Sequence, residues 1–213
     1  MTARLAALAG TAFVVLYVAA FTLGIEVGHG DREILEHYAD SGHRTREVVA
    51  FFFIAAAALA LIVFAAGLRS RIASSEAHTG SLAAVAWAGG VAAGALVLAA
   101  NAVSRATAFA AMDDDFRLDP DSRRLLEDTG FLLFVSGALA AILLVVAVSL
   151  AALRLNVLPR WLGWAGFVVA LLLPLAIAFV GFLVFLLWVL ATSAALAFGG
   201  ASPQARAAAG AAP

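Results

Sequence analysis

The segment Trp161–Phe198 contains 38 residues without a charged side chain, and this run constrains the fold more than any other part of the sequence. As a single helix it would be about 57 Å long, at about 1.5 Å per residue. The hydrocarbon core of a membrane is only about 30 Å thick, and tilting cannot absorb so large an excess. The run must therefore fold back, and Pro174 and Gly181 are the available helix breakers. We predict helices at Trp161–Ala176 and Val180–Phe198, joined by an apolar turn.

The composition of the whole chain of 213 residues also indicates a membrane protein. Hydrophobic residues make up 64% of the sequence and charged residues 13%, whereas soluble domains have about 45–50% and about 25%. The net charge of −1 does not predict a nucleic-acid partner. Cysteine is absent, which excludes disulfides and cysteine-ligated metal centres, and none of the four histidines lies within an apolar run. We therefore expect no cofactor.

Four further apolar segments bring the predicted number of membrane-spanning helices to six. These segments are Leu5–Gly24, Val48–Leu68, Ser81–Asn101 and Phe131–Leu153. The first could be a cleaved signal peptide, but its apolar core exceeds the usual length of about 7–15 residues, so we expect it to be retained. The third continues in the same pattern to Met112, so its helix should project beyond the lipid.

The predicted fold is an all-α, polytopic membrane helical bundle with six transmembrane helices in three hairpins. We expect a single domain over residues 1–198 and a disordered Ala/Gly-rich tail over residues 199–213. Two long acidic loops, at residues 25–47 and 113–128, should each carry a short amphipathic helix. Asp31 can cap the first of these helices, and Asp119 followed by proline can start the second, which Gly130 would separate from the fourth span.

The apolar turn near Pro174–Gly181 should emerge on the same side as both acidic loops and should need a cover. We predict that the short helices Asp31–Asp40 and Asp119–Asp128 fold over it. Four side chains would then contact the turn or nearby helix ends: Leu35, Tyr38, Leu125 and Leu126.

Arginine counts alone do not orient the bundle. With both termini on one side, that side holds six arginines and a single acid, Glu76, and the other side holds seven arginines and 13 acids. The arginines of the first side crowd into short loops, where positive charge favours the cytoplasmic side. We predict a multi-pass protein of the cytoplasmic membrane with both termini in the cytoplasm and both acidic loops outside.

One candidate ligand or ion-pair site lies near the predicted membrane boundary. Asn101 and Arg105 are four residues apart and therefore share one helix face. Glu26, at the end of the first span, should lie at a similar depth. A structural ion pair is one interpretation of this group, and a site for an anion or a lipid headgroup is the other.

No metal site is predicted, although three side chains of the first acidic loop are of types that bind zinc. These are Glu33, His37 and Asp40. Their spacing fits no common zinc motif, and a solvated surface helix explains them better. The acid-rich second loop lacks the glycine and glutamate positions of an EF-hand, so we interpret it as solvated as well.

Gly90 and Gly94 form a GxxxG step in the third span, which lets two helices approach closely. Packing within the chain is the expected use of this step, and the seam of a homo-oligomer is the alternative. The interiors of the predicted spans contain no Asp, Glu, Lys or His. This composition argues against a proton relay and against an intramembrane protease.

Three short motifs are similar to those of a known group of proteins: Tyr38–Arg44, Asp119–Asp121 and Leu158-Pro-Arg-Trp-Leu-Gly-Trp164. With them the chain resembles a family of small multi-span membrane proteins of bacteria, mostly actinobacteria, which is defined as a domain of unknown function. The resemblance covers most of the chain, from the first span to the last. It implies the topology and a bacterial origin, but no activity.

The sequence is compatible with three functions. A non-enzymatic accessory or interaction protein, with membrane lipids and other membrane proteins as partners, is the first. A transporter of small molecules or lipids that uses Asn101, Arg105 and Glu26 is the second, and a water-filled cavity reaching the first two residues would favour it. A membrane enzyme acting on a lipid-soluble substrate is the third, and convergence of His37 and Asp40 with the second-loop acids would favour it.

Overall fold

The fold is helical throughout the residues that the computed structural model describes, which are 2–24, 30–76, 80–113 and 115–198. Six helical segments of this part of the chain are long and apolar enough to cross a membrane, which confirms the predicted class. They are α1 (Ala3–Leu23), α3 (Ser41–Ala73), α4 (Ser81–Ala110), α5 (Pro120–Leu155), α6 (Arg160–Leu172) extended by the 3-10 helix η1 (Leu173–Ala178), and α7 (Val180–Phe198). A short amphipathic helix, α2 (Asp31–Ala39), lies between the first two spans as predicted.

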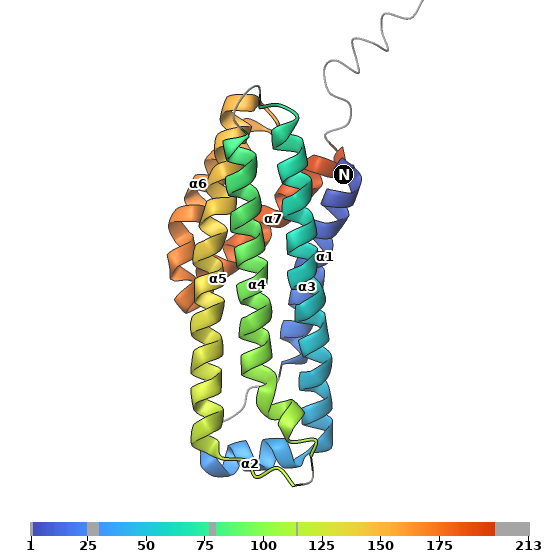
Figure 1. Cartoon of the computed structure of the whole chain (residues 1–213), viewed down its shortest axis with the longest axis vertical. Coiled ribbons are helices and arrows are strands. Elements are labelled where there is room, and N and C mark those ends of the chain that lie inside the picture. Colours follow the sequence, from blue (N-terminus) through green and yellow to red (C-terminus); the bar gives the residue numbers. More distant parts are fainter. Residues whose placement is uncertain (1, 25–29, 77–79, 114, 199–213) are drawn as a thin grey trace, which may run out of the picture.

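Helices α3, α4 and α5 form the elongated centre of the bundle (Figure 1). They have 33, 30 and 36 residues, whereas about 20 residues suffice to cross a membrane. Helix α1 packs against α3 and α7, and α6 packs against α5. These shorter helices leave one end of the long ones uncovered, and α2 lies across that end. We call it the α2 end of the bundle, and the opposite end, where α1 begins, the α1 end.

Small residues allow the long helices to pack closely. A Cβ added to Gly89 would lie 2.5 Å from the backbone nitrogen of Leu144 in α5, a distance that real contacts do not show. Gly90 faces Ala65 in α3, and Gly94 faces Ile62 in the same helix. The GxxxG step is therefore used for packing within the chain. The homo-oligomer through Gly90 and Gly94 stays a prediction, and it would have to compete with this packing.

Helix α3 begins earlier than the sequence analysis expected, at Ser41 instead of Val48. Asp40 caps it, because its carboxylate accepts hydrogen bonds from the backbone N–H groups of Gly42 at 2.6 Å and His43 at 3.1 Å. The correction matters for function, because Glu47 belongs to the helix and is buried, whereas the sequence placed it in a solvated loop.

The second predicted short helix is not a separate element. Asp119 caps a helix, as expected, by accepting a hydrogen bond from the backbone of Ser122 at 3.1 Å, but that helix is α5, which runs unbroken to Leu155. Gly130 does not end a helix. It lies against Ser104 and the carbonyl of Ala100 in α4, so its missing side chain permits close packing.

The apolar run folds back as predicted, with η1 beginning next to Pro174 and Phe179 in the left-handed region at φ 59°. The predicted cover over this turn is wrong. The ring of Phe179 packs 5.9 Å from Phe131 and 5.8 Å from Phe134, more than two turns inside α5, whereas α2 crosses the end of the long helices (Figure 1). Leu125 is 68% exposed. The long helices extend past the turn, so a cap on their ends cannot reach it.

Candidate functional site

Glu47 is the centre of a buried polar cluster at the α2 end. Its residue is 6% exposed, although it carries a carboxylate. Oε1 lies 2.8 Å from Nε2 of His37, and Oε2 accepts a hydrogen bond from the hydroxyl of Tyr38 at 3.4 Å. An ionised carboxylate only accepts hydrogen bonds, so Nε2 of His37 carries a hydrogen in this arrangement. Two side chains of α2 thus bind one side chain of α3.

Arg105 approaches the same carboxylate from α4. Its Nη1 lies 3.8 Å from Oε2 of Glu47, and its side chain is 18% exposed. One turn away, Nδ2 of Asn101 donates to the carbonyl of Phe51 at 3.0 Å, while its buried Oδ1 has no hydrogen-bond partner among the described residues. Glu26, the third member of the predicted group, lies outside the described residues. The acid that the structure places beside Arg105 is Glu47.

Arg123 attaches α5 to this arrangement. Its Nε donates to the hydroxyl of Tyr38 at 2.7 Å, its guanidinium lies 5.7 Å from the centre of the Tyr38 ring, and it also pairs with Glu127. Arg123 is itself buried. On the other side, Nη1 of Arg44 donates to the backbone carbonyl of Tyr38 at 2.5 Å. Tyr38 is therefore held by partners from two long helices.

We call His37, Tyr38, Glu47, Arg105 and Arg123 the Glu47 cluster. Its members come from α2, α3, α4 and α5, so it joins the short helix to all three long ones. Two carboxylates, of Glu47 and Glu127, face two guanidinium groups, so the formal charges cancel. The two buried charges, of Glu47 and Arg123, require partners, and the less buried Arg105 and the exposed Glu127 supply them within the chain.

The three side chains considered for zinc point to different partners. Glu33 accepts a hydrogen bond from the backbone N–H of Gly30 at 3.2 Å and so caps α2, and Asp40 caps α3. The backbone N–H groups of His43 and Gly42 hold the pKa of Asp40 below its usual range. His37 turns to Glu47. The part of the chain that the structure describes contains no group of three His, Cys, Asp or Glu side chains arranged to hold a metal ion.

Sequence reasoning identified Arg105 and His37 but missed Glu47 and Arg123. One signal could have revealed Glu47. It directly precedes the apolar run that starts at Val48, and a carboxylate at such a position loses solvent when the helix begins upstream of it. To use this signal, one must recognise that Asp40, eight residues before Val48, caps α3, so that the helix begins at Ser41.

Tyr38 offers a spectroscopic test of the cluster. Burial, and next the nearby carboxylate of Glu47, raise the pKa of Tyr38 to about 12. Because the pKa of Tyr38 is higher in the folded than in the unfolded chain, the protonated hydroxyl adds to the free energy of unfolding. This contribution is complete below about pH 10 and is lost as the pH rises toward 12. The chain has two tyrosines, so a Tyr17→Phe variant reports Tyr38 alone. Its absorbance near 295 nm is expected to titrate well above pH 10, and a midpoint at the value of the denatured protein would contradict the buried cluster.

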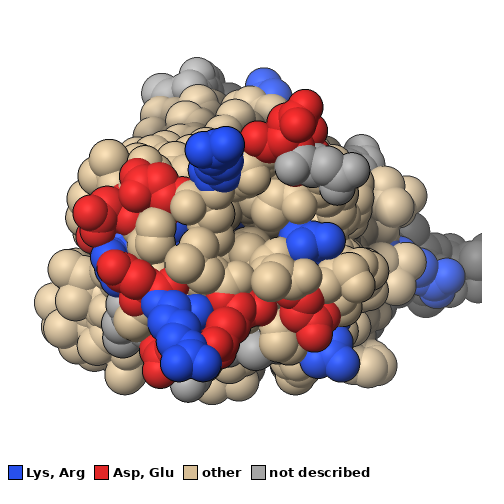
Figure 2. Space-filling view, turned by 90° about the horizontal axis from the view of Figure 1, so that it is seen from below, with Lys and Arg blue, Asp and Glu red and all other residues tan. Residues whose placement is uncertain are grey.

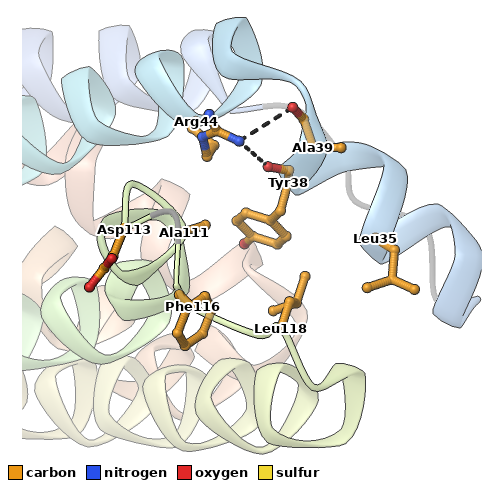
Figure 3. A pocket seen from close by; sticks show the side chains of 8 residues that line it. All are labelled: Leu35, Tyr38, Ala39, Arg44, Ala111, Asp113, Phe116 and Leu118. Atoms are coloured by element: carbon orange, nitrogen blue, oxygen red, sulfur yellow. Dashed lines mark hydrogen bonds between the residues drawn. The ribbon is translucent and has the colours of Figure 1, made fainter.

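A shallow cavity of about 290 Å³ adjoins the cluster at the α2 end (Figure 3). Its lining combines apolar side chains with polar groups, and Tyr38, Arg44 and Asp113 contribute the polar ones. The lining residues are Leu35, Tyr38, Ala39, Arg44, Ala111, Asp113, Phe116 and Leu118. Neither Asn101 nor Arg105 lines this cavity. Neither of them lines the second cavity, of about 240 Å³, at the α1 end.

The surface of the α2 end carries both signs of charge. Figure 2 shows acidic and basic side chains interspersed over this face with other residues between them. Several pair with each other, such as Arg32 with Glu36, and Arg124 with Asp31 and Asp121. Exposed pairs of this kind contribute little stability, and a mixed surface of this kind does not select a strongly charged partner.

Comparisons of the chain with protein-family models, with curated proteins and with solved structures gave no match.

Proposed function

We propose that this chain is a non-enzymatic accessory or interaction protein of a bacterial cytoplasmic membrane, and that it binds other proteins at its α2 end. The observation that carries the proposal is the closure of the Glu47 cluster. Glu47 and Arg123 are buried, and their bonds to His37 and Tyr38 fix α2 on the long helices as a rigid platform. Among the cluster members only Tyr38 lines a cavity, so the charged groups do not face an open site of the kind that transport or catalysis would need.

The expected position in the membrane supports this assignment. Trp161 and Trp164 are exposed at the start of α6, where interfacial tryptophans mark a membrane boundary. Gly163 packs at the same level against Leu153 of α5. About 20 helical residues cross the hydrocarbon core, so α5 reaches the other boundary near Leu133. The Glu47 cluster lies beyond that level, where the charge of its members is tolerated and where soluble domains of partners can reach it.

The orientation in this proposal places both termini in the cytoplasm and the α2 end outside. Its support is the arginine content of the short loops at the α1 end, where Glu76 is the only acid in the sequence segments concerned. The bacterial origin in this proposal is supported by the resemblance of the sequence motifs to bacterial multi-span proteins. The cavity beside Tyr38 is then an extracytoplasmic surface feature with both apolar and polar lining, which suits a partner side chain that has an apolar body and a polar tip.

A photo-crosslinking experiment tests function and orientation together. The sequence contains no cysteine, so one introduced cysteine is a unique reporter. A Phe116→Cys variant, in the cavity wall, should react in intact cells with a membrane-impermeant maleimide that carries a benzophenone. Irradiation should then give a discrete product of higher mass. Leu125→Cys, exposed at the same end but outside the cavity, should be labelled equally and give much less product.

Ser75→Cys, exposed in the loop at the α1 end, serves as the orientation control. It should react only after the membrane is permeabilised, and the reverse pattern would overturn the orientation. If Phe116→Cys is labelled but yields no discrete product, the interaction proposal fails at this surface.

A transporter is the second candidate, and one observation favours it. The buried Oδ1 of Asn101 has no partner among the described residues, and the adjacent Arg105 has donors that Glu47 does not occupy. Such a pair could bind a polar solute in another conformation. An Asn101→Cys variant that reacts with soluble reagents as fast as Phe116→Cys would favour transport. The enzyme alternative has less support, because His37 and Asp40 bind separate partners within the chain.

A further inference from the structure

The cavity at the α1 end lies between three helices and has a different character from the one at the α2 end. It measures about 240 Å³ and lies between the start of α1, the end of α3 and the end of α7. Its apolar wall comes from Ala3, Ala6, Gly67 and Leu196, and its polar wall comes from Ser70, Arg71 and Ser74. The volume holds a phosphodiester group with a few waters, since a water takes up about 30 Å³ in the liquid.

Arg71 is held in a position to bind an anion. Its Nε donates to the carbonyl of Val157 in the loop between α5 and α6, at 2.8 Å. This contact fixes the guanidinium plane and leaves the two terminal amino groups for another acceptor. No carboxylate pairs with Arg71 among the described residues. A guanidinium with two free amino groups fits the two oxygens of a phosphate.

The surroundings of Arg71 add to the attraction for an anion. The hydroxyl of Ser70 has no hydrogen-bond partner within the described part of the chain and lines the same cavity. The first turn of α1 adds the backbone N–H groups of Ala3 and Arg4, which helix geometry leaves unpaired, whereas Thr2 caps that of Leu5. The acid of the neighbouring loop, Glu76, is already engaged, because it accepts hydrogen bonds from the backbone N–H groups of Leu82 and Ala83 at 3.1 and 3.2 Å.

Apolar side chains beside the cavity point to a lipid as the source of the phosphate. Leu5 and Leu8 of α1 and Phe198 of α7 are exposed on two of the helices that form the cavity. Basic pockets between transmembrane helices bind the headgroups of anionic lipids. We propose that the cavity at the α1 end binds the phosphate of an anionic phospholipid through Arg71 and Ser70, with the acyl chains lying along α1 and α7.

Native mass spectrometry of the full chain in detergent tests the site with dioleoyl-phosphatidylglycerol as the probe. Arg71→Gln should weaken its binding about five-fold, the loss expected for one arginine near a membrane surface. Ser70→Leu keeps the charge but fills the cavity, and should weaken binding as well. Arg154→Gln removes an exposed arginine from the same end and should leave binding unchanged.

Further arms of the experiment separate the alternatives. Arg71→Lys keeps the positive charge but loses the fork of donors, so it should recover only part of the binding that Arg71→Gln loses. Circular dichroism of both variants checks that substitutions at this position leave the fold intact. Phosphatidylcholine should bind more weakly than phosphatidylglycerol to the unmodified protein. Equal losses in Arg71→Gln and Arg154→Gln would mean diffuse attraction and would overturn the site. Inorganic phosphate that binds with dependence on Arg71 while phosphatidylglycerol does not would overturn the lipid assignment.

Discussion

Replacing Glu47 by alanine is expected to lower the free energy of unfolding by about 3 kcal/mol, because the change leaves buried partners without their acceptor. The Glu47 carboxylate would be lost to three groups: the hydroxyl of Tyr38, Nε2 of His37 and the guanidinium of Arg105. The loss should begin at the α2 end, so the backbone amides of α2 should exchange hydrogen faster. Equilibrium unfolding in mixed micelles measures the first effect, and hydrogen exchange with mass spectrometry measures the second.

Two further variants show whether burial causes this loss. Glu47→Gln keeps an oxygen that accepts hydrogen bonds, so its effect should be smaller than that of alanine. Glu36→Ala removes an exposed carboxylate that pairs with Arg32 on the same α2 helix, and should cost at most about 1 kcal/mol. Equal losses for Glu36→Ala and Glu47→Ala would show that the cluster does not hold α2 in place.

Substituting Gly89 by leucine is expected to lower the free energy of unfolding by about 3 kcal/mol, at the upper end of the range for overpacked cores. The new Cβ would lie 2.5 Å from the backbone nitrogen of Leu144, and backbone cannot move aside as a flexible side chain can. The interface between α4 and α5 would have to open along its length. Unfolding in mixed micelles and the yield of monodisperse protein after purification both measure this result.

Ala88→Leu is the matched control for this substitution. It places a leucine at the neighbouring residue, which is exposed on the surface of α4. It should change the stability by less than about 0.5 kcal/mol, as surface substitutions usually do. If Gly89→Leu is as well tolerated as Ala88→Leu, then α4 and α5 do not pack as closely as described.

The candidate site shows where sequence reasoning stops. The spacing of Asn101 and Arg105 placed them correctly on one face, because helical periodicity is local. Glu47 was assigned to a loop, because its partners are ten residues away in His37 and 58 residues away in Arg105. A buried carboxylate and a solvated one have the same letter in a sequence. Which of them is present depends on the partners that the fold brings close.

The sequence by itself determined that this chain is helical, that six of its segments are long and apolar enough to cross a membrane, and that the run Trp161–Phe198 folds back. Both follow from the length of apolar segments compared with the thickness of a membrane, and neither requires knowledge of tertiary contacts. Only the tertiary structure decided that α5 continues through Gly130, that α2 covers the long helices instead of the apolar turn, and that Glu47 is buried. These outcomes depend on packing and charge pairing between segments far apart in the chain, such as Gly130 against Ser104 and Tyr38 against Arg123.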